Sequence, residues 1–173
     1  MHKPSVTQLL DLLAKPALIT WANEQGLKGV NIKTARQSAL KSGTSMHAQI
    51  EAKDFADPEV RQNYERFMSD KELIDSEQEI ETEWFTGRYD ARIKWRGLTY
   101  LVDYKKSRRQ RVYFEYKLQL AAYSMGVQAD RFAMVATPAF IPVEVNLSED
   151  MPKYREVLIA LSKIYQLRQE LGA

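Results

Sequence analysis

The sequence predicts an α/β fold in which a mixed sheet is flanked by helices. Apolar residues recur at helical spacing through most of residues 1–75, and the period changes to two from Glu77 onward. Beyond the first strands, helical and strand patterns alternate, which is typical of a sheet covered by helices. A chain of 173 residues is long enough to bury its own core. We therefore expect a single domain over residues 1–173, with a mainly helical part at 1–75 and a sheet core at 76–173.

Helix-capping and helix-breaking residues divide the predicted helical part into short helices. Ser5 is a good N-cap, and Pro16 interrupts the apolar pattern of residues 5–25, so two helices are expected there. Gly43 should end the next helix, and Thr44 or Ser45 should begin another. The remaining elements are expected as helices at 32–40, 58–69, 113–125 and 152–171, and as strands from 77, in a hairpin at 87–105, at 131–137 and at 139–145.

The hairpin at 87–105 has a register that follows from counting. Gly97 supplies the positive φ that the favoured two-residue turns require, so the turn is placed at Arg96 and Gly97. Trp95 then pairs with Leu98.

Continued along both strands, this register places Asp90 directly opposite Asp103. Cross-strand Cβ atoms lie roughly 4.5–5.5 Å apart, and like charges there repel unless a cation or a shared proton offsets them. Lys105 follows two residues later on the same face, whereas the other face carries the apolar set Leu98, Tyr100 and Val102. The hairpin thus outlines a metal site. The alternative is a surface salt bridge of Asp103 with Lys105 or Arg88.

Composition restricts the chemistry that such a site can use. The chain has no cysteine, which excludes disulfides, thiolate zinc sites, cysteine nucleophiles and an iron–sulfur cluster. With 45% hydrophobic and 28% charged residues and no long uncharged apolar window, a soluble protein without a membrane partner is expected. No secretion signal is evident at the start, so we expect a cytoplasmic location.

A local basic run follows the two aspartates, although the net charge is only +2. Five cations fall within seven residues: Lys105, Lys106, Arg108, Arg109 and Arg111. Such a run is either a solvated loop or a set of phosphate contacts, and its position beside the aspartates supports the second interpretation.

Four further side chains could join the site. His47 is either a partly exposed helix residue or a nitrogen ligand for Mn²⁺ or Mg²⁺, and Glu51 lies one turn further along its helix. Gln119 and Tyr123 share one face of the helix after the basic run, which by spacing alone is an ordinary polar face.

Four segments of the chain resemble successive motifs of the RecB-like branch of the PD-(D/E)XK nuclease superfamily. They are Gly43-Thr-Ser-Met-His47, Gly87-Arg-Tyr-Asp90, Val102-Asp-Tyr-Lys105 and Gln119-Leu-Ala-Ala-Tyr123. The segments Pro4-Ser-Val-Thr-Gln and Lys15-Pro-Ala-Leu-Ile-Thr-Trp21 are similar to the start of small phage-type exonucleases of this branch. The matches cover about half the chain, from residue 43 to residue 123, and their order and spacing are more specific than any one of them.

The resemblance implies a restriction-endonuclease-like core and roles for the matching positions. Lys105 would orient or deprotonate the attacking water, and Gln119 and Tyr123 would position the nucleic acid and the lysine. Divalent metal, Mg²⁺ or Mn²⁺, would be held by His47, Asp90, Asp103 and the carbonyl of Tyr104. The basic-run residues Lys106, Arg108, Arg109 and Arg111 would contact nucleic acid.

The expected function is therefore metal-dependent hydrolysis of DNA, by an exonuclease that prefers single strands or strand ends, in recombination, repair, replication or phage DNA metabolism. Any helicase or recombination partner would be a separate protein, because no helicase motif is present. The sequence leaves the oligomeric state open. Two alternatives remain: a non-catalytic nucleic-acid-binding module that keeps the nuclease fold, and an enzyme acting on a smaller phosphate ester.

Overall fold

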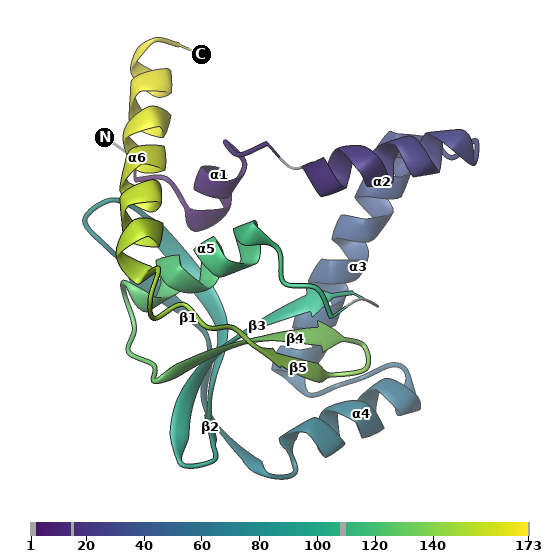
Figure 1. Ribbon diagram of the computed structural model, residues 1–173. Coiled ribbons are helices and arrows are strands. Elements are labelled where there is room, and N and C mark those ends of the chain that lie inside the picture. The colour runs from purple at the N-terminus through teal and green to yellow at the C-terminus, as the bar shows by residue number, and fades with distance from the viewer. Residues whose placement is uncertain (1–2, 15, 108–109, 173) are drawn as a thin grey trace.

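The computed structural model describes residues 3–14, 16–107 and 110–172 and shows a five-stranded mixed sheet flanked by helices (Figure 1). The strands are β1 (Lys71–Glu81), β2 (Thr86–Trp95), β3 (Leu98–Lys106), β4 (Arg131–Thr137) and β5 (Ile141–Glu144). They lie in the order β1-β2-β3-β4-β5, and only the β3–β4 pair is parallel. The predicted α/β class with a mixed, helix-flanked sheet is confirmed.

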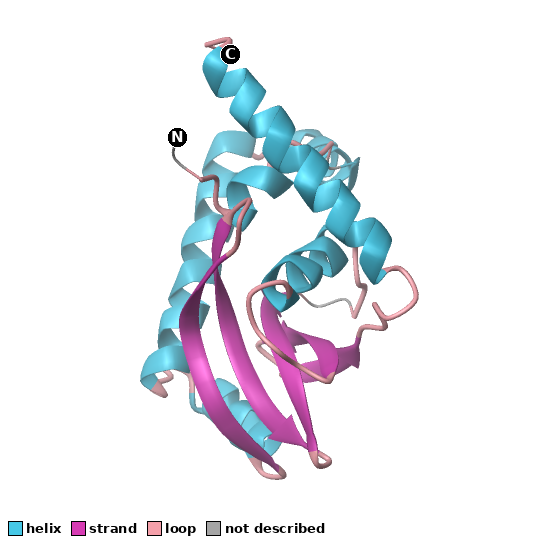
Figure 2. Ribbon diagram, turned by 90° about the vertical axis from the view of Figure 1, so that its left-hand side faces the viewer, coloured by secondary structure: helices cyan, strands magenta, loops and turns pink. Residues whose placement is uncertain are grey.

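Helices cover both faces of the sheet (Figure 2). They are α1 (Val6–Leu10), α2 (Pro16–Leu27), α3 (Ile32–Ala52), α4 (Pro58–Met68), α5 (Phe114–Ser124) and α6 (Met151–Glu170). The short helices α1 and α5 pack with α6 on one face, and α5 makes the crossover between the parallel strands β3 and β4. Helices α3 and α4 contribute to the core on the other face.

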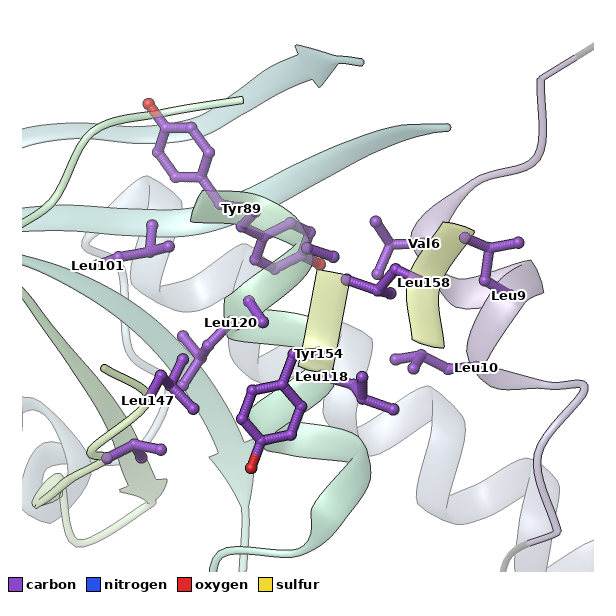
Figure 3. Close-up of a cluster of buried hydrophobic side chains, with 14 of the residues drawn as sticks. Val6, Leu9, Leu10, Tyr89, Leu101, Leu118, Leu120, Leu147, Tyr154 and Leu158 are labelled. Atoms are coloured by element: carbon purple, nitrogen blue, oxygen red, sulfur yellow. The ribbon is translucent and has the colours of Figure 1, made fainter. Parts of the chain in front are cut away.

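Buried side chains form one hydrophobic cluster on each face. The first joins the sheet to α1, α5 and α6 through residues such as Leu9, Leu101, Leu118 and Leu158, each fully buried (Figure 3). The second joins Met46 and Ile50 of α3 to Val102 and Val135 of the sheet, together with an aromatic group around Phe140. Leu101 and Val102 alternate between the two clusters, as the period of a strand requires.

The predicted hairpin register is confirmed over its described ladder. Arg96 and Gly97 have φ of 52° and 76°, so the turn has positive φ at both central residues. The pairing runs from Trp95 opposite Leu98 to Ala91 opposite Val102.

Helix α3 corrects the expectation of two helices separated at Gly43. It runs without interruption from Ile32 to Ala52. The hydroxyl of Thr44 donates to the Leu40 carbonyl at 3.2 Å, so this residue is satisfied inside the helix instead of capping a new one. Burial of Met46 and Ile50 favours continuation and offsets the cost of a helical glycine, about 1 kcal/mol.

Strand β1 begins at Lys71, before the predicted start at Glu77, so the sheet core begins before residue 76. The early part of the strand lacks an apolar alternation because its charged residues are paired. Lys71 is buried over the Phe67 and Trp95 rings, with its Nζ at 4.6 and 4.5 Å from the ring centres. The strand also ends at Glu81, because the Thr82 hydroxyl accepts from the amides of Trp84 and Phe85 and forms a turn.

Gly126 is required for close packing, and its effect can be tested. A Cβ on this residue would lie 2.7 Å from the Cβ of Ile80. We expect Gly126→Ala to lower the free energy of unfolding by about 1–3 kcal/mol, the usual cost of overpacking. The control is Gly43→Ala, where a Cβ meets nothing within 4 Å and should stabilise the helix by about 0.5–1 kcal/mol. Urea unfolding measures both; equal stability of the two variants would contradict the packing role.

Among the helices of the described residues, none combines the length and apolarity needed to cross a membrane.

Candidate metal centre and basic site

Asp90 lies one residue beyond the described end of the β2–β3 ladder. The described pairing stops at Ala91 opposite Val102. Beyond it, the Tyr104 amide donates to Oδ2 of Asp90 at 2.6 Å, so a carboxylate occupies the place of a backbone acceptor. The direct opposition of Asp90 and Asp103 lies one step beyond the last described pair and stays a prediction; the Asp90 side chain holds the neighbouring strand at this point.

Lys105 and Asp103 lie together on one face of β3, as predicted. Nζ of Lys105 donates to Oδ1 of Asp103 at 2.9 Å and lies 2.7 Å from Oδ2. Asp103 is fully buried, so this is not the exposed salt bridge considered as an alternative. Oδ2 has no hydrogen bond of good geometry to any described residue. The ammonium group of Lys105 already supplies a cation to both oxygens of this buried carboxylate.

The charge of Lys105 is maintained by its neighbours. Burial favours the neutral amine, but the charges of Asp103 and Asp90 outweigh it and raise the pKa of Lys105. In the metal-free site the lysine is therefore a cation.

His47 connects α3 to the end of the hairpin. Its Nε2 lies 3.1 Å from the Tyr104 carbonyl, and its Nδ1 lies 3.5 Å from Oδ1 of Asp90. A carbonyl only accepts, so the Nε2 atom carries the hydrogen in this contact. Nδ1 then faces carboxylate oxygen, an arrangement that needs a proton or a cation between them. The Tyr104 carbonyl, which was predicted as a metal ligand, accepts this hydrogen bond from Nε2 of His47.

Glu77 is the site residue that the sequence analysis missed. His47, Glu77 and Asp90 each offer a ligand atom, and these atoms all lie within 4.8 Å of one another. Glu77 falls between the pairs Ser76–Ala91 and Gln78–Tyr89, which places it opposite Asp90. Its φ is 52°, and its Oε2 lies 3.0 Å from Nε of Arg88. Of the predicted ligands, Asp103 is paired with Lys105, and Glu77 adds a further carboxylate next to His47 and Asp90.

A small cavity of about 20 Å³ lies beside this cluster and is lined by His47, Glu77 and Asp90 as well as by Glu51. That volume is of the order of one water molecule or ion. Carboxylate oxygens with one imidazole nitrogen suit Mn²⁺, and Mg²⁺ accepts the carboxylates with water. The residues present therefore fit a divalent cation, with Glu51 at the margin of the cavity.

Gln119 and Tyr123 share one side of α5, as predicted. Nε2 of Gln119 donates to the Tyr123 hydroxyl at 2.8 Å. Burial, followed by the charges of Asp103 and Asp90, raises the pKa of Tyr123 and keeps it neutral. The aromatic residue over the lysine is instead Tyr116, whose ring centre lies 5.4 Å from Nζ of Lys105.

The described part of the basic run lies along one edge of the site. Lys106 is exposed, and its Nζ contacts the Ser42 hydroxyl of α3. The guanidinium of Arg111 lies 5.2 Å from the Tyr113 ring centre. Arg108 and Arg109 lie outside the described residues.

The pKa of Asp90 predicts how metal binding depends on pH. Burial, and then the charge of Asp103, raise this pKa from 3.8 to about 7. The proton therefore favours the folded metal-free state, and its stabilising effect is lost as pH rises from about 4 through about 7. A cation competes with this proton, so Mn²⁺ affinity should fall by up to about tenfold per unit below pH 7.

Calorimetric titration at pH 6, 7 and 8, in two buffers of different ionisation enthalpy, measures both affinity and proton release. Glu51→Gln, which changes only the cavity margin, should keep the same pH dependence. Equal Mn²⁺ affinity at pH 6 and pH 8 would contradict the role of Asp90.

Comparisons with known proteins do not identify a family. No family model matches the chain, and no curated protein matches it significantly. Among solved structures, the chain is similar to one described as the crystal structure of SSO0001, with a TM-score of 0.41 and 17% sequence identity. That similarity covers 91% of this chain and 75% of the other.

Proposed function

We propose that this protein is a divalent-metal-dependent nuclease that hydrolyses DNA phosphodiester bonds and has a restriction-endonuclease-like PD-(D/E)XK core. The observation that carries the proposal is the buried Lys105–Asp103 pair on β3 beside the His47–Glu77–Asp90 cluster. It combines a fixed cation with oxygen and nitrogen ligands, which is what a scissile phosphate requires.

Phosphodiester hydrolysis needs a nucleophilic water, neutralisation of phosphate charge and stabilisation of the leaving oxygen. His47, Glu77 and Asp90, with the buried oxygen of Asp103, would hold Mg²⁺ or Mn²⁺. A bound cation of this kind supplies Lewis acidity and lowers the pKa of a coordinated water.

The protein's own side chains supply the remaining steps. Lys105, protonated and held by Asp103, binds a non-bridging phosphate oxygen and stabilises its growing negative charge. Tyr116 covers the lysine and limits its access to water. The hydrogen bond from Gln119 to Tyr123 holds these two side chains of α5 in fixed positions.

An exonuclease with a preference for single strands or strand ends is the most specific form of the proposal. It is supported by the resemblance of the four motifs and by the basic residues Lys106 and Arg111 next to the site. Salt-sensitive DNA binding would separate it from an enzyme for small phosphate esters.

The test uses end-labelled linear DNA and covalently closed circular DNA, single- and double-stranded, with Mn²⁺, Mg²⁺ or EDTA. We expect metal-dependent loss of the linear substrates with circles intact. Nicked circles would make the protein an endonuclease. Binding without cleavage under every condition would overturn the proposal in favour of a non-catalytic binding module.

A further inference from the structure

An open groove of about 600 Å³ leads away from Lys105 between α1, α2, α3 and α5. Lys105 and Gln119 are part of its lining, so the groove is continuous with the proposed site of hydrolysis. Six of the residues that line it are aromatic or aliphatic: Leu10, Leu18, Trp21, Leu40, Tyr113 and Tyr116. We call this the aromatic groove.

Several of these apolar side chains are exposed within the described structure. Leu18 and Leu40 are 40% and 62% exposed, and Trp21, Tyr113 and Tyr116 are only partly buried. Exposed apolar surface beside a charged site is typical of a ligand-binding region.

The charges around the aromatic groove distinguish its interior from its margin. Its lining includes two carboxylates, Asp11 and Glu115, which disfavour phosphate inside it. Lys105 lines the end of the groove next to the proposed site of hydrolysis, and further cations lie at the margin. Arg111 stacks on Tyr113, and Lys106 contacts Ser42 two residues beyond Leu40. An apolar interior with a basic margin is complementary to bases inside and phosphates outside.

We propose that the aromatic groove binds one or two unpaired nucleotides of the DNA strand to be cleaved, with their bases against Trp21 and Tyr113. This inference rests on the proposed function, which already prefers unpaired strands or strand ends, and adds the surface that would hold the unpaired nucleotides. A groove of about 600 Å³ has room for one or two nucleotides. Base–aromatic stacking tolerates any sequence, because every base has a π face.

Binding can be measured separately from catalysis. The probe is fluorescein-labelled oligo-dT in EDTA, followed by anisotropy, with a blunt duplex of equal length as the second probe. Trp21→Ala should weaken oligo-dT binding by about 5- to 100-fold, the range for loss of one stacking residue. Blunt-duplex binding should change less than about twofold, and Trp21→Phe should restore most of the oligo-dT affinity.

Two further variants control for the fold and for position. Phe114→Ala removes an aromatic side chain that is 51% exposed and does not line the groove, so it should bind oligo-dT like the unchanged protein. Leu40→Glu adds a carboxylate at a 62% exposed helix position, where folding tolerates it, and should weaken oligo-dT binding. Circular dichroism verifies the fold of each variant.

The outcomes separate this inference from the proposed function. If the unchanged protein cleaves DNA but Trp21→Ala and Leu40→Glu bind oligo-dT normally, the groove assignment is wrong and the nuclease stands. If Trp21→Ala loses binding but no condition gives cleavage, the groove stands and the nuclease is wrong. Equal losses on oligo-dT and blunt duplex would also overturn the preference for unpaired nucleotides.

Discussion

Lys105→Ala is expected to lower DNA cleavage by about 10²–10³-fold, the usual cost of removing one group that stabilises a charged transition state. Lys105 is the cation paired with the buried Asp103, and it also lines the aromatic groove, so it would contact the phosphate of a bound strand. Cleavage of labelled linear DNA with Mn²⁺ measures the effect.

The same change has a cost in stability that must be separated from the cost in activity. Removing one partner of a buried ion pair leaves the other charge uncompensated, which destabilises proteins by about 3–5 kcal/mol. Assays should therefore be run well below the melting temperature, after circular dichroism has verified folding. Lys94→Ala is the matched control, because this exposed lysine of β2 lies outside the cation cluster and the aromatic groove and should retain activity within a few-fold. Near-normal cleavage by folded Lys105→Ala would refute its role.

Asp103→Asn is expected to weaken Mn²⁺ binding by about 10–100-fold or more, the range for residues in or next to a metal's ligand shell. The change keeps the shape of the side chain but removes a charge from a fully buried position. Isothermal calorimetry with Mn²⁺ measures the affinity.

Two comparisons interpret that result. Asp150→Asn, a change at an exposed aspartate paired with Lys153, should leave the affinity unaltered. Glu77→Gln tests the cluster that the structure brings together. Loss of affinity in Glu77→Gln with none in Asp103→Asn would exclude Asp103 as a ligand and leave the His47–Glu77–Asp90 group.

The elements that the sequence predicted well are those determined by local signals. Ser5 caps α1 through a reciprocal capping box with Gln8, and Pro16 begins α2. Gly97 determines a two-residue turn, and the turn determines the register from Trp95–Leu98 to Ala91–Val102. With that register, the shared face of Asp103 and Lys105 follows from the period of a strand.

The features that the sequence did not reveal depend on contacts between distant segments. Glu77 meets Asp90 through the β1–β2 register, which runs without a shift from Glu81 opposite Thr86 to Asp75 opposite Arg92. The sequence did not reveal this register because the four-residue connection at 82–85 contains no glycine and no two-residue turn signal. Nothing in the sequence indicated that the Asp90 carboxylate accepts a hydrogen bond from the Tyr104 amide. Gly43 does not end a helix, because burial of neighbouring side chains outweighs its low propensity.

Because α3 is continuous through Gly43, it fixes the distance between the aromatic groove and the cation cluster. Leu40 in the aromatic groove and His47 at the cation cluster lie seven residues apart, two helical turns, on nearly the same side of one helix. At 1.5 Å per residue this is about 10 Å along the helix axis. Helix α3 would therefore keep the proposed base-binding groove and the cation cluster at a constant separation.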